Sequence, residues 1–502
     1  MSTNLVNIIF GMKVRQARTE RGLTLSDFAT LCELSPSYVT EIEKGRKYPR
    51  ADKIMKMAEV LGKEYDDLVS IKLAPSLTYL GSALSSSVLQ RFPFEEFGLE
   101  AGDLVTLLTR EPVKASALLH AVLEIGRRYD LQEEDVLRAI LRSYQEIHEN
   151  YFQELEDAAL AFTAEVGVRY GLAGEPSLAI TTLETILEQE YRYQIDTTTI
   201  TANSILSRYR SALLPGKRPR LLVNSALHPR QINFVLAREL GYQYLQLKER
   251  SLTSTPDQIN SFQQILNDFK AAYFGGALLM PRASMLADLQ HFFNERRWDP
   301  ELLLGMLEKY DITPEMLLYR FSELIPQFFG IKLHFLRFHY AASSGRYQLI
   351  KQLNMNRLLV PSGIGLDEHY CRRWLSVRLL NDIAPVDHVK LFETPHVGVQ
   401  LSEFLGSQER FLCIGFSRPL VLSPDVISSV IIGFRVDNDL KNAIHFVDDP
   451  AIPHTIINET CERCPLTAEQ CQERAAAPAI LLANQAATAR KLALTELQNR
   501  FR

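Results

Sequence analysis

Apolar residues recur at spacings of three and four along most of the chain up to residue 325, which is the pattern of amphipathic helices. A short apolar run at 219–225 predicts a strand between two of these helices. Beyond residue 326 the pattern changes to alternation and β-branched enrichment, and it predicts strands at 332–340, 397–405, 410–416 and 430–436. We therefore predict a multidomain chain with an all-α beginning, a mostly α middle and an α+β C-terminal domain.

The same changes of pattern predict the domain boundaries. A module of short helices occupies residues 1–72, and a Ser-, Leu- and Pro-rich linker followed by helices occupies 73–150. The mostly α domain takes 151–325, and the α+β domain takes 326–478. The Ala- and Leu-rich segment 479–502 predicts a final helix.

Composition narrows the class of protein. The chain has 502 residues, of which 46% are hydrophobic and 23% charged, and these values exclude wholesale disorder. Lys and Arg number 55 against 60 Asp and Glu, so nucleic-acid binding requires a local basic patch. No apolar run reaches the roughly 20 residues of a membrane-spanning helix, and the N-terminus does not have the pattern of a secretory signal. We expect a cytoplasmic protein with no membrane partner.

The N-terminal helices have the order of a helix-turn-helix motif. Thr24 is placed to cap the helix before the turn and Ser35 the helix after it. We expect the second helix, at 35–44, to lie in the major groove with its polar residues at base edges, while basic residues meet phosphates. The residues predicted to contact DNA are Arg15, Arg18, Thr24, Ser35, Ser37, Tyr38, Thr40, Glu41, Lys44, Arg46 and Lys47. The alternative is a solvated basic face on a helical bundle.

This module resembles a known family. The segment "GLTLSDFATLCELSPSYVTEIEKGRKYPRADKIMKMAEVLGKEYDDL" is similar to the XRE-type helix-turn-helix family along its whole length. One departure is Leu25, where the family often has a Gln that touches a phosphate. The resemblance implies sequence-specific binding to double-stranded DNA. Because one recognition helix buries too little surface for tight binding, we expect a homodimer or higher homo-oligomer. Its predicted contact surfaces are the helices between 87 and 195 and the final helix.

A second resemblance concerns the middle domain. The segments "INFVLARELGYQYL" and "FKAAYFGGALLMP" resemble the immunity-repressor (ImmA/IrrE) metallopeptidases, in which a His-Glu-x-x-His helix binds zinc. Arg238 and Tyr242 stand at the two histidine positions, and Glu239 alone remains. Arginine cannot offer a lone pair to a metal, and Asp268 alone does not hold zinc. We interpret the domain as a scaffold without peptidase chemistry, in which Arg238 and Glu239 pair; the alternative is an active metallopeptidase. The Gly-Gly of the second segment predicts close helix packing, and the alternative is the wall of a ligand pocket.

Cysteines near the C-terminus have metal-ligand spacing. Cys461, Cys464 and Cys471 form C-x2-C-x6-C. The fourth ligand is Cys371 or Cys413, and we favour Cys371 because Cys413 lies mid-strand among large apolar residues. Four thiolates suit structural zinc or an iron–sulfur cluster. The alternative is a group of thiols without metal.

The whole chain resembles the short-chain fatty acyl transcriptional regulator family. The resemblance lies in "YFGGALLMP", "YDITPEMLLYRFSEL", "IKLHFLRFHYAASSGRYQ", "HYCRRWLSV", "VIIGFRVDNDLKNAIHFVDD" and "CERCPLTAEQCQERAAAP". Members often have Cys-Pro-x-Trp where this chain has Cys-Arg-Arg-Trp, and Gly-Cys-Asp where it has Gly-Phe-Arg. The resemblance implies control of genes for short-chain acyl metabolism, with an acyl-coenzyme A ester as effector. A rival interpretation is a regulator whose metal or cluster sets its activity.

Coenzyme A needs basic residues for its phosphates, an aromatic face and an apolar slot for the acyl group. Arg337, Arg346 and Tyr347, near the first strand of the C-terminal domain, are the candidates for this effector site. The alternative is that they are ordinary surface residues.

Overall fold

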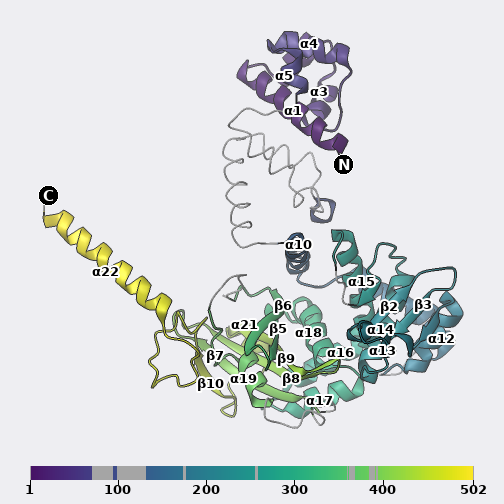
Figure 1. Cartoon of the computed structure of the whole chain (residues 1–502), viewed down its shortest axis with the longest axis vertical. Helices are drawn as coiled ribbons and strands as arrows, with labels where there is room; N and C mark the ends of the chain where they lie inside the picture. The colour runs from purple at the N-terminus through teal and green to yellow at the C-terminus, as the bar shows by residue number, and fades with distance from the viewer. Residues whose placement is uncertain are drawn as a thin grey trace. The chain divides into compact units, whose positions relative to one another are not determined.

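The computed structural model describes residues 2–70, 94–98, 132–172, 177–254, 258–358, 360, 368–383, 391 and 394–500 (Figure 1). The predicted linker and, of the helices predicted as dimerisation surfaces, the part at 99–131 lie outside these residues. The chain divides into two compact units, Met1–Ile140 with Asn260–Phe262 and Leu141–Ile259 with Gln263–Arg502. Each unit is described by itself below.

The first unit contains the predicted all-α module. Its helices are α1 (Ser2–Glu20), α2 (Leu25–Leu31), α3 (Pro36–Glu43), α4 (Ala51–Leu61) and α5 (Tyr65–Val69), and a 3-10 turn, η2, covers Phe94–Phe97. The amphipathic faces of the helices meet in a core that includes Phe10, Val14, Phe28, Val39 and Ile42. This shared core fixes the angle between α2 and α3 on which a helix-turn-helix depends.

The two predicted caps start the helices of the motif. The Asp27 backbone N–H donates to Thr24 Oγ1 at 3.1 Å, and the Tyr38 N–H donates to Ser35 Oγ at 3.2 Å. Each cap satisfies a backbone N–H that has no partner within its helix. At Gly11 a Cβ would stand 2.2 Å from the Ile42 carbonyl oxygen, so α1 and α3 approach at a distance that requires glycine.

The second unit begins with a helical layer around a small sheet. Its helices are α10 (Glu133–Ile147), at the boundary between the units, α11 (Gln153–Glu165), α12 (Ile180–Tyr191), α13 (Thr199–Ala202), α14 (Pro229–Tyr244), α15 (Phe262–Leu279), α16 (Arg282–Asn294), α17 (Pro300–Lys309) and α18 (Pro314–Phe329), with 3-10 turns η3 (Gly167–Tyr170) and η4 (Leu206–Arg208). The sheet has the order β1-β3-β2-β4, with bounds Gln194–Asp196, Arg220–Val223, Ser211–Leu214 and Thr253–Ser254. The strand predicted at 219–225 is β3, and the other three strands are too short to leave an alternating pattern.

A buried ionic network joins the first and last helices of this layer. Arg320 of α18 donates to both carboxylate oxygens of Glu156 on α11, at 2.6 and 2.9 Å, and to Glu323 at 2.8 Å. The Tyr273 hydroxyl donates to Glu156 at 2.9 Å. The Arg320 side chain is 0% exposed, so these carboxylates neutralise a charge that water does not reach.

The C-terminal domain is built on a six-stranded sheet of order β10-β7-β8-β9-β5-β6. The strands are β5 (Leu333–Ala341), β6 (Arg346–Asn354), β7 (His396–Phe404), β8 (Arg410–Leu420), β9 (Ser423–Arg435) and β10 (His454–Ile457). Neighbours are antiparallel, except that β10 runs parallel to β7. The four predicted strands are β5, β7, β8 and β9, so the predicted α+β character of this domain is confirmed.

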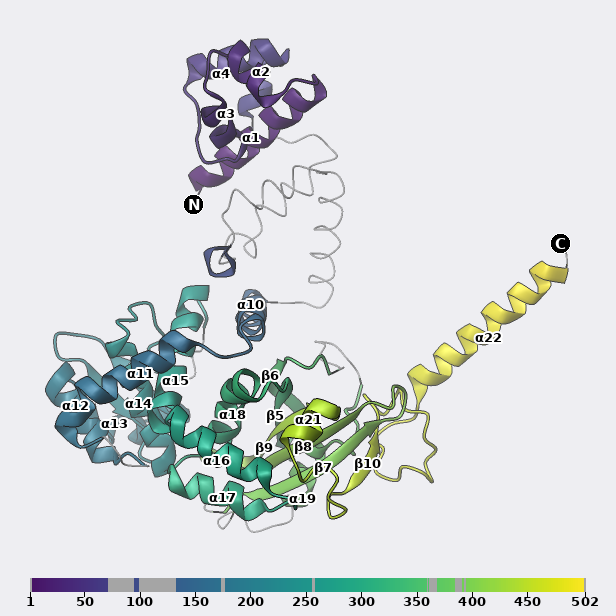
Figure 2. The same ribbon diagram turned by 180° about the vertical axis from the view of Figure 1, so that it is seen from behind.

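Helices cover the two faces of this sheet. The helix α19 (Leu375–Ile383) contacts β5, β7, β8 and β9 on one face, and its carbonyls accept from Ser417 and Ser429 at 2.8 Å each. The neighbouring residues of those strands point the other way, towards α18, which lies beside β5 and β9 in Figure 2. The short helix α21 (Asn438–Ala443) follows β9. The α19 face and the α18 face therefore carry separate sets of side chains.

The predicted final helix is α22 (Ala479–Arg500), and no residue of it is buried. Among the described residues, none of the helices combines the length and the apolar character needed to cross a membrane.

Candidate functional site

The start of α3 presents the predicted base-reading residues. Ser35 and Ser37 are exposed, with their hydroxyl oxygens 3.1 Å apart. Tyr38, Thr40 and Glu41 follow on the helix and are half-buried. The side chains that the sequence places at the groove thus lie together at the N-terminal end of one capped helix.

Basic side chains lie just after α3 and beside Tyr38. Arg46 and Lys47 are exposed just beyond α3, and Arg46 pairs with Glu41 at 3.2 Å. Lys47 and Lys53 place their Nζ atoms 5.7 and 4.5 Å from the centre of the Tyr38 ring. Lys53 was missed from sequence because it lies on α4 and reaches α3 only in the folded module. Lys44, also predicted, is half-buried.

Two of the predicted DNA contacts have other partners in the structure. Arg18 donates to both Glu43 carboxylate oxygens at 2.6 and 3.0 Å and to the Leu23 carbonyl at 2.7 Å, and its side chain is 13% exposed. It therefore ties α1 to α3 instead of facing a phosphate. Thr24 is the cap of α2, and its hydroxyl donates to Asp27 at 2.6 Å. Arg15 is half-buried on α1.

The former zinc-ligand positions lie on α14. Arg238 and Tyr242 are four residues apart and therefore share a helix face. The Tyr242 hydroxyl donates to the Asp268 carboxylate of α15. The Arg250 guanidinium stacks 3.6 Å from the centre of the Tyr242 ring, and burial raises the pKa of the Tyr242 hydroxyl. The three positions at which a zincin would hold its metal are thus occupied by a guanidinium, a phenol and a hydrogen-bonded carboxylate.

The carboxylate of Glu239 is also engaged. Arg250 donates to its two oxygens at 2.5 and 2.7 Å, and the Tyr193 hydroxyl donates at 2.6 Å. The predicted pair of Glu239 with Arg238 is wrong, because consecutive helix residues point about 100° apart. Arg238 lies near Tyr242 instead, with its guanidinium carbon 5.5 Å from the ring centre. Glu239 is therefore part of a closed network and is not poised over a water.

The prediction of close packing at the Gly-Gly pair is confirmed. At Gly275 of α15 a Cβ would stand 2.9 Å from the Arg238 backbone nitrogen, and at Gly241 of α14 one would stand 2.8 Å from the Ala271 carbonyl oxygen. The two helices that would carry the metal ligands therefore touch backbone to backbone. Gly276 has no such contact closer than 4.0 Å.

Four cysteines gather near the C-terminus of the sheet domain. Cys371, Cys461, Cys464 and Cys471 are all buried. Backbone bonds join their segments: the Cys371 N–H donates to the Glu459 carbonyl at 3.2 Å, and the Cys461 N–H donates to the His369 carbonyl at 2.9 Å. The segment of Cys371 is thereby held against the cysteine loop that follows it by ninety positions in the chain.

The surroundings of Cys371 suit a thiolate in part. Burial raises the pKa of its thiol to about 11, the backbone N–H groups of Asn458 and Arg373 lower it, and the thiols of Cys461 and Cys464 raise it. N–H groups directed at a sulfur stabilise its ionised form, which is the form that binds metal. As the thiol side chains stand, however, no group of three or more His, Cys, Asp or Glu side chains in the described part of the chain is placed to hold a metal ion.

Cys413 does not belong to this group. It lies on β8, where Ser402 donates to its sulfur at 3.8 Å, and burial raises the pKa of its thiol to about 12. The prediction that it is a buried apolar residue is confirmed by its 5% exposure in the core of the domain.

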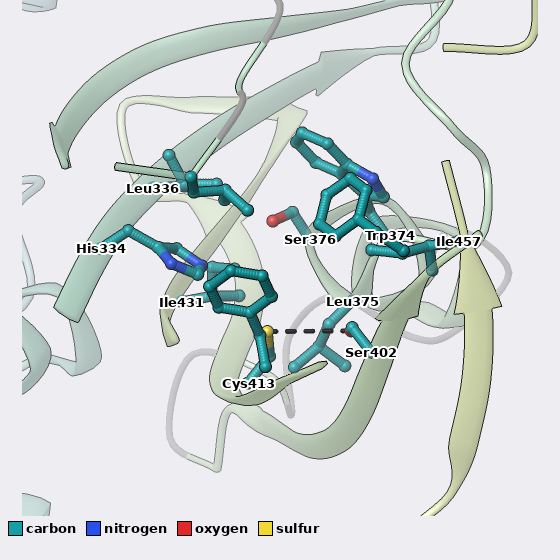
Figure 3. A pocket seen from close by; sticks show the side chains of 12 residues that line it. His334, Leu336, Trp374, Leu375, Ser376, Ser402, Cys413, Ile431 and Ile457 are labelled. Carbon is teal, nitrogen blue, oxygen red and sulfur yellow. Dashed lines mark hydrogen bonds between the residues drawn. The ribbon is translucent and has the colours of Figure 1, made fainter. Parts of the chain in front are cut away.

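A small, partly open pocket lies on the α19 face of the sheet (Figure 3), and we call it the cavity. It is lined by His334, Leu336, Leu358, Trp374, Leu375, Ser376, Ser402, Phe404, Phe411, Cys413, Ile431 and Ile457. Burial lowers the pKa of His334 to about 4, although its bond to Asn356 raises it, so the ring is neutral near pH 7. The Ser376 hydroxyl oxygen is buried and has no hydrogen-bond partner. The cavity is therefore apolar and uncharged, with one unsatisfied hydroxyl on its wall.

The predicted effector residues do not line this cavity. Arg337 points to the α18 face, where it lies 3.9 Å from Glu315, and Arg346 is exposed at the start of β6. Tyr347 packs on the same apolar cluster as the cavity residues, and the Arg372 guanidinium lies 4.2 Å from its ring centre. The lining residues were missed because seven separate stretches of the chain supply them.

Comparison with known proteins identifies two of the regions described above. Residues 14–68 match the family described as helix-turn-helix. Residues 192–322, which include α14, α15 and most of α18, match the family described as IrrE N-terminal-like domain.

Three individual proteins are similar to this chain. The HTH-type transcriptional regulator RamB of Mycobacterium tuberculosis is 24% identical over 360 residues, which cover 67% of this chain and 70% of RamB. The control protein C.BamHI of Bacillus amyloliquefaciens is 34% identical over 68 residues, which cover 13% of this chain and 84% of that protein. A solved structure, "Mycobacterium tuberculosis transcriptional regulator", has a TM-score of 0.45 at 18% identity and covers 67% of this chain and 92% of its own.

Proposed function

Because the chain belongs to the XRE-type helix-turn-helix transcriptional regulators that carry an IrrE-like domain, we propose that it controls genes of short-chain acyl metabolism and that an acyl-coenzyme A ester is its effector. One observation carries the choice of effector: the cavity of the sheet domain is lined mostly by apolar side chains, and Tyr347, with Arg372 at its ring, packs on the same apolar cluster. We propose a cytoplasmic location, where a DNA-binding regulator meets its operator.

The cavity suits the acyl group of such an ester. Its lining is mostly aliphatic and aromatic, and each buried CH₂ contributes about 0.8 kcal/mol. His334 is neutral near pH 7, so the cavity offers no cation to a free carboxylate. The Ser376 hydroxyl, which has no hydrogen-bond partner among the described residues, is the donor we assign to the thioester carbonyl. Tyr347 and Arg372 lie beside the same cluster and offer an aromatic face and a charge to the rest of the coenzyme.

Calorimetry with propionyl-coenzyme A, free coenzyme A and propionate tests the effector. We expect the ester to bind more tightly than free coenzyme A, because only the ester fills the cavity. Ser376→Ala should weaken ester binding by about five- to tenfold, the value of one hydrogen bond. Ser402→Ala is the matched control, since Ser402 also lines the cavity but already donates to Cys413. Equal affinity for the ester and free coenzyme A would rule out the acyl slot.

Regulation requires that the ester change DNA binding. We propose a homodimer on two half-sites, since one α3 helix contacts too little DNA for specific binding. A gel-shift titration with and without propionyl-coenzyme A tests the coupling, and sedimentation of the full chain tests the dimer. A chain that stays monomeric on its DNA would contradict the second proposal.

We propose in addition that Cys371, Cys461, Cys464 and Cys471 hold structural zinc or an iron–sulfur cluster. Three features support it: the four thiols are buried, backbone bonds join their segments, and N–H groups point at the Cys371 sulfur. Such a group would fasten the tail to the sheet domain and, if it is a cluster, would add a redox response.

The metal proposal is tested by metal analysis and by an ultraviolet–visible spectrum of anaerobically purified protein, since only a cluster absorbs in the visible. Each single Cys→Ser change at the four positions should lower the metal content and expose the tail to proteolysis. Cys413→Ser is the control and should keep the metal. Full metal occupancy in Cys371→Ser would show that the fourth ligand lies elsewhere.

The IrrE-like domain, we propose, is a scaffold and not a peptidase. Arg238 and Tyr242 replace both histidines of the motif, and Arg250 occupies the carboxylate that would polarise water. The test is peptide hydrolysis with added zinc. Cleavage that a chelator abolishes would overturn the proposal.

A further inference from the structure

The α18 face of the sheet carries a group of four arginines, which we call the arginine cluster: Arg210, Arg238, Arg337 and Arg418. Arg418 of β8 donates to Glu315 of α18 at 2.7 and 3.2 Å, and Arg337 of β5 lies 3.9 Å from the same carboxylate. Arg210, just before β2, interacts electrostatically with all four of these charged neighbours: Arg238, Glu315, Arg337 and Arg418. The IrrE-like domain and the sheet domain each contribute two of the guanidinium groups.

The cluster has an excess of positive charge. Of the strongest electrostatic influences on Arg210 among the described residues, Glu315 alone is acidic. Lys351 stands opposite Arg337 in the β5–β6 register, and burial together with the charge of Arg337 lowers its pKa to about 7. Glu323, which interacts with Lys351, is already bound to Arg320 at 2.8 Å. One carboxylate therefore balances four guanidinium groups, and like charges at close range repel strongly away from water.

Two members of the cluster have no polar partner. Within the described residues, the guanidinium groups of Arg210 and Arg238 form neither an ion pair nor a hydrogen bond. Arg210 and Arg238 are both half-buried residues. Burial first, and then the charge of Arg337, lower the pKa of Arg210, which is about 10.

Neighbouring polar atoms are also unsatisfied. Within the ranges that the structure describes, His339 Nε2 and Ser254 Oγ are buried without hydrogen-bond partners. His339 interacts electrostatically with Arg337 and Arg210, and the Ser254 carbonyl accepts from the Arg210 N–H at 3.2 Å. Unsatisfied donors beside unpaired cations are what a missing anionic ligand leaves behind.

We propose that the arginine cluster is a binding site for a phosphate group. A guanidinium presents a planar fork of donors that matches an oxyanion, and a dianion fits the excess charge better than a monocarboxylate does. The ligand bridges the two domains, because Arg210 and Arg238 approach it from the IrrE-like domain while Arg337 and Arg418 approach it from the sheet.

The site is distinct from the acyl cavity. Arg337 and Arg418 lie on the α18 face, whereas the cavity residues of the same strands, Leu336 and Phe411, lie on the α19 face. The proposal therefore stands or fails independently of the proposed effector.

Thermal melting of the full chain tests the site, with inorganic phosphate, coenzyme A, acetate and sodium chloride compared at equal ionic strength. We expect phosphate to raise the melting temperature in a concentration-dependent way, since a ligand of the folded state stabilises it. The double variant Arg210→Met, Arg238→Met should lose that shift while keeping or raising the melting temperature without ligand, because it relieves repulsion. Arg220→Met, an exposed arginine of the neighbouring strand β3, is the matched control and should keep the shift.

Arg210→Lys is a second, more conservative variant that tests the site even if the double variant does not fold. It keeps the charge and removes the fork, and it should weaken phosphate binding by about tenfold in calorimetry. A shift with phosphate supports a site for free phosphate, and a shift with coenzyme A alone, lost in the double variant, supports a site for a phosphate ester. The proposal is overturned if chloride or acetate acts as strongly as phosphate, if the double variant keeps the shift, or if neither phosphate nor coenzyme A produces one.

Discussion

The DNA-binding module and the IrrE-like domain both keep the fold of their families, but they differ in what stands at the functional positions. In the module, the polar start of α3 and the basic residues after it are exposed. In the IrrE-like domain, the two helices meet as closely as the fold requires, yet Arg238 and Tyr242 stand where the histidines would be. A family match therefore settles the backbone, and only the side chains settle the chemistry.

The difference extends to how each region uses its charges. The module leaves Lys47 exposed and Lys53 half-buried, and both ammonium groups lie over the Tyr38 ring. The IrrE-like domain turns its charged residues inward, into the network of Glu239 with Arg250 and Tyr193. Charged side chains that bind a polyanion must stay solvated until it arrives. Charged side chains buried at the positions of a metal site must form ion pairs and hydrogen bonds with one another.

The largest expected effect comes from breaking that inward network. Glu239→Ala leaves Arg250, whose side chain is 10% exposed, without its counter-ion, and should lower the free energy of unfolding by about 3–5 kcal/mol. Urea unfolding measures it. Glu59→Ala, which removes a 74% exposed partner of Lys56, is the control and should cost less than about 1 kcal/mol. A cost for Glu239→Ala as small as that of the control would mean that the network does not replace the metal.

A smaller effect tests the close contact between α14 and α15. Gly275→Ala pushes a methyl group against the α14 backbone and should cost about 1–3 kcal/mol. Gly276→Ala, one residue on and without a contact nearer than 4.0 Å, should be neutral or stabilising by up to about 1 kcal/mol. Thermal unfolding of the pair measures the difference, and equal stabilities would remove the close contact from the argument.

The outward charges of the module are tested by DNA binding. Replacing Arg46 and Lys47 by Ala should weaken binding to all sequences by about tenfold or more, and should reduce the slope of log affinity against log salt by about 2. The measurement is a gel-shift titration at several salt concentrations. Unchanged affinity would remove these residues from the DNA interface.

The smallest effect separates a cap from a DNA contact. Thr24→Ala should lower the stability of the module by about 1 kcal/mol, because the Asp27 N–H loses its acceptor. DNA affinity measured well below the melting temperature should not change. A loss of affinity without a loss of stability would return Thr24 to the interface.

Local features of the fold could be predicted from sequence. The caps at Thr24 and Ser35 depend on residues three positions apart. The strands β5, β7, β8 and β9 could be predicted from the alternation of apolar and polar residues. Strand β6 was missed because only Leu353 on it is fully buried, which leaves charged and apolar residues mixed. Strand β10 has four residues and is too short to show a period.

Partners from other elements could not be predicted. The sequence suggested the adjacent Arg238 as the ion-pair partner of Glu239. In the structure the partner is Arg250, which lies further along the chain. Arg337 and Leu336 are neighbours in sequence, yet the pleat sends one to the arginine cluster and the other to the cavity. Which face of a strand meets which ligand is decided by the helices that cover it, and no spacing rule contains that information.

The buried triad of Glu156, Arg320 and Glu323 also affects the order in which the helices pack during synthesis of the chain. Glu156 leaves the ribosome 164 residues before Arg320. At about 5–20 residues per second, its carboxylate waits roughly ten to thirty seconds for the charge that neutralises it. Until then burial of α11 requires its carboxyl group to be protonated or unpaired, which costs free energy that the arrival of α18 removes. The core of the IrrE-like domain is therefore completed by its last helix, α18. A chain that ends before α18 lacks the Arg320 charge and leaves this core incomplete.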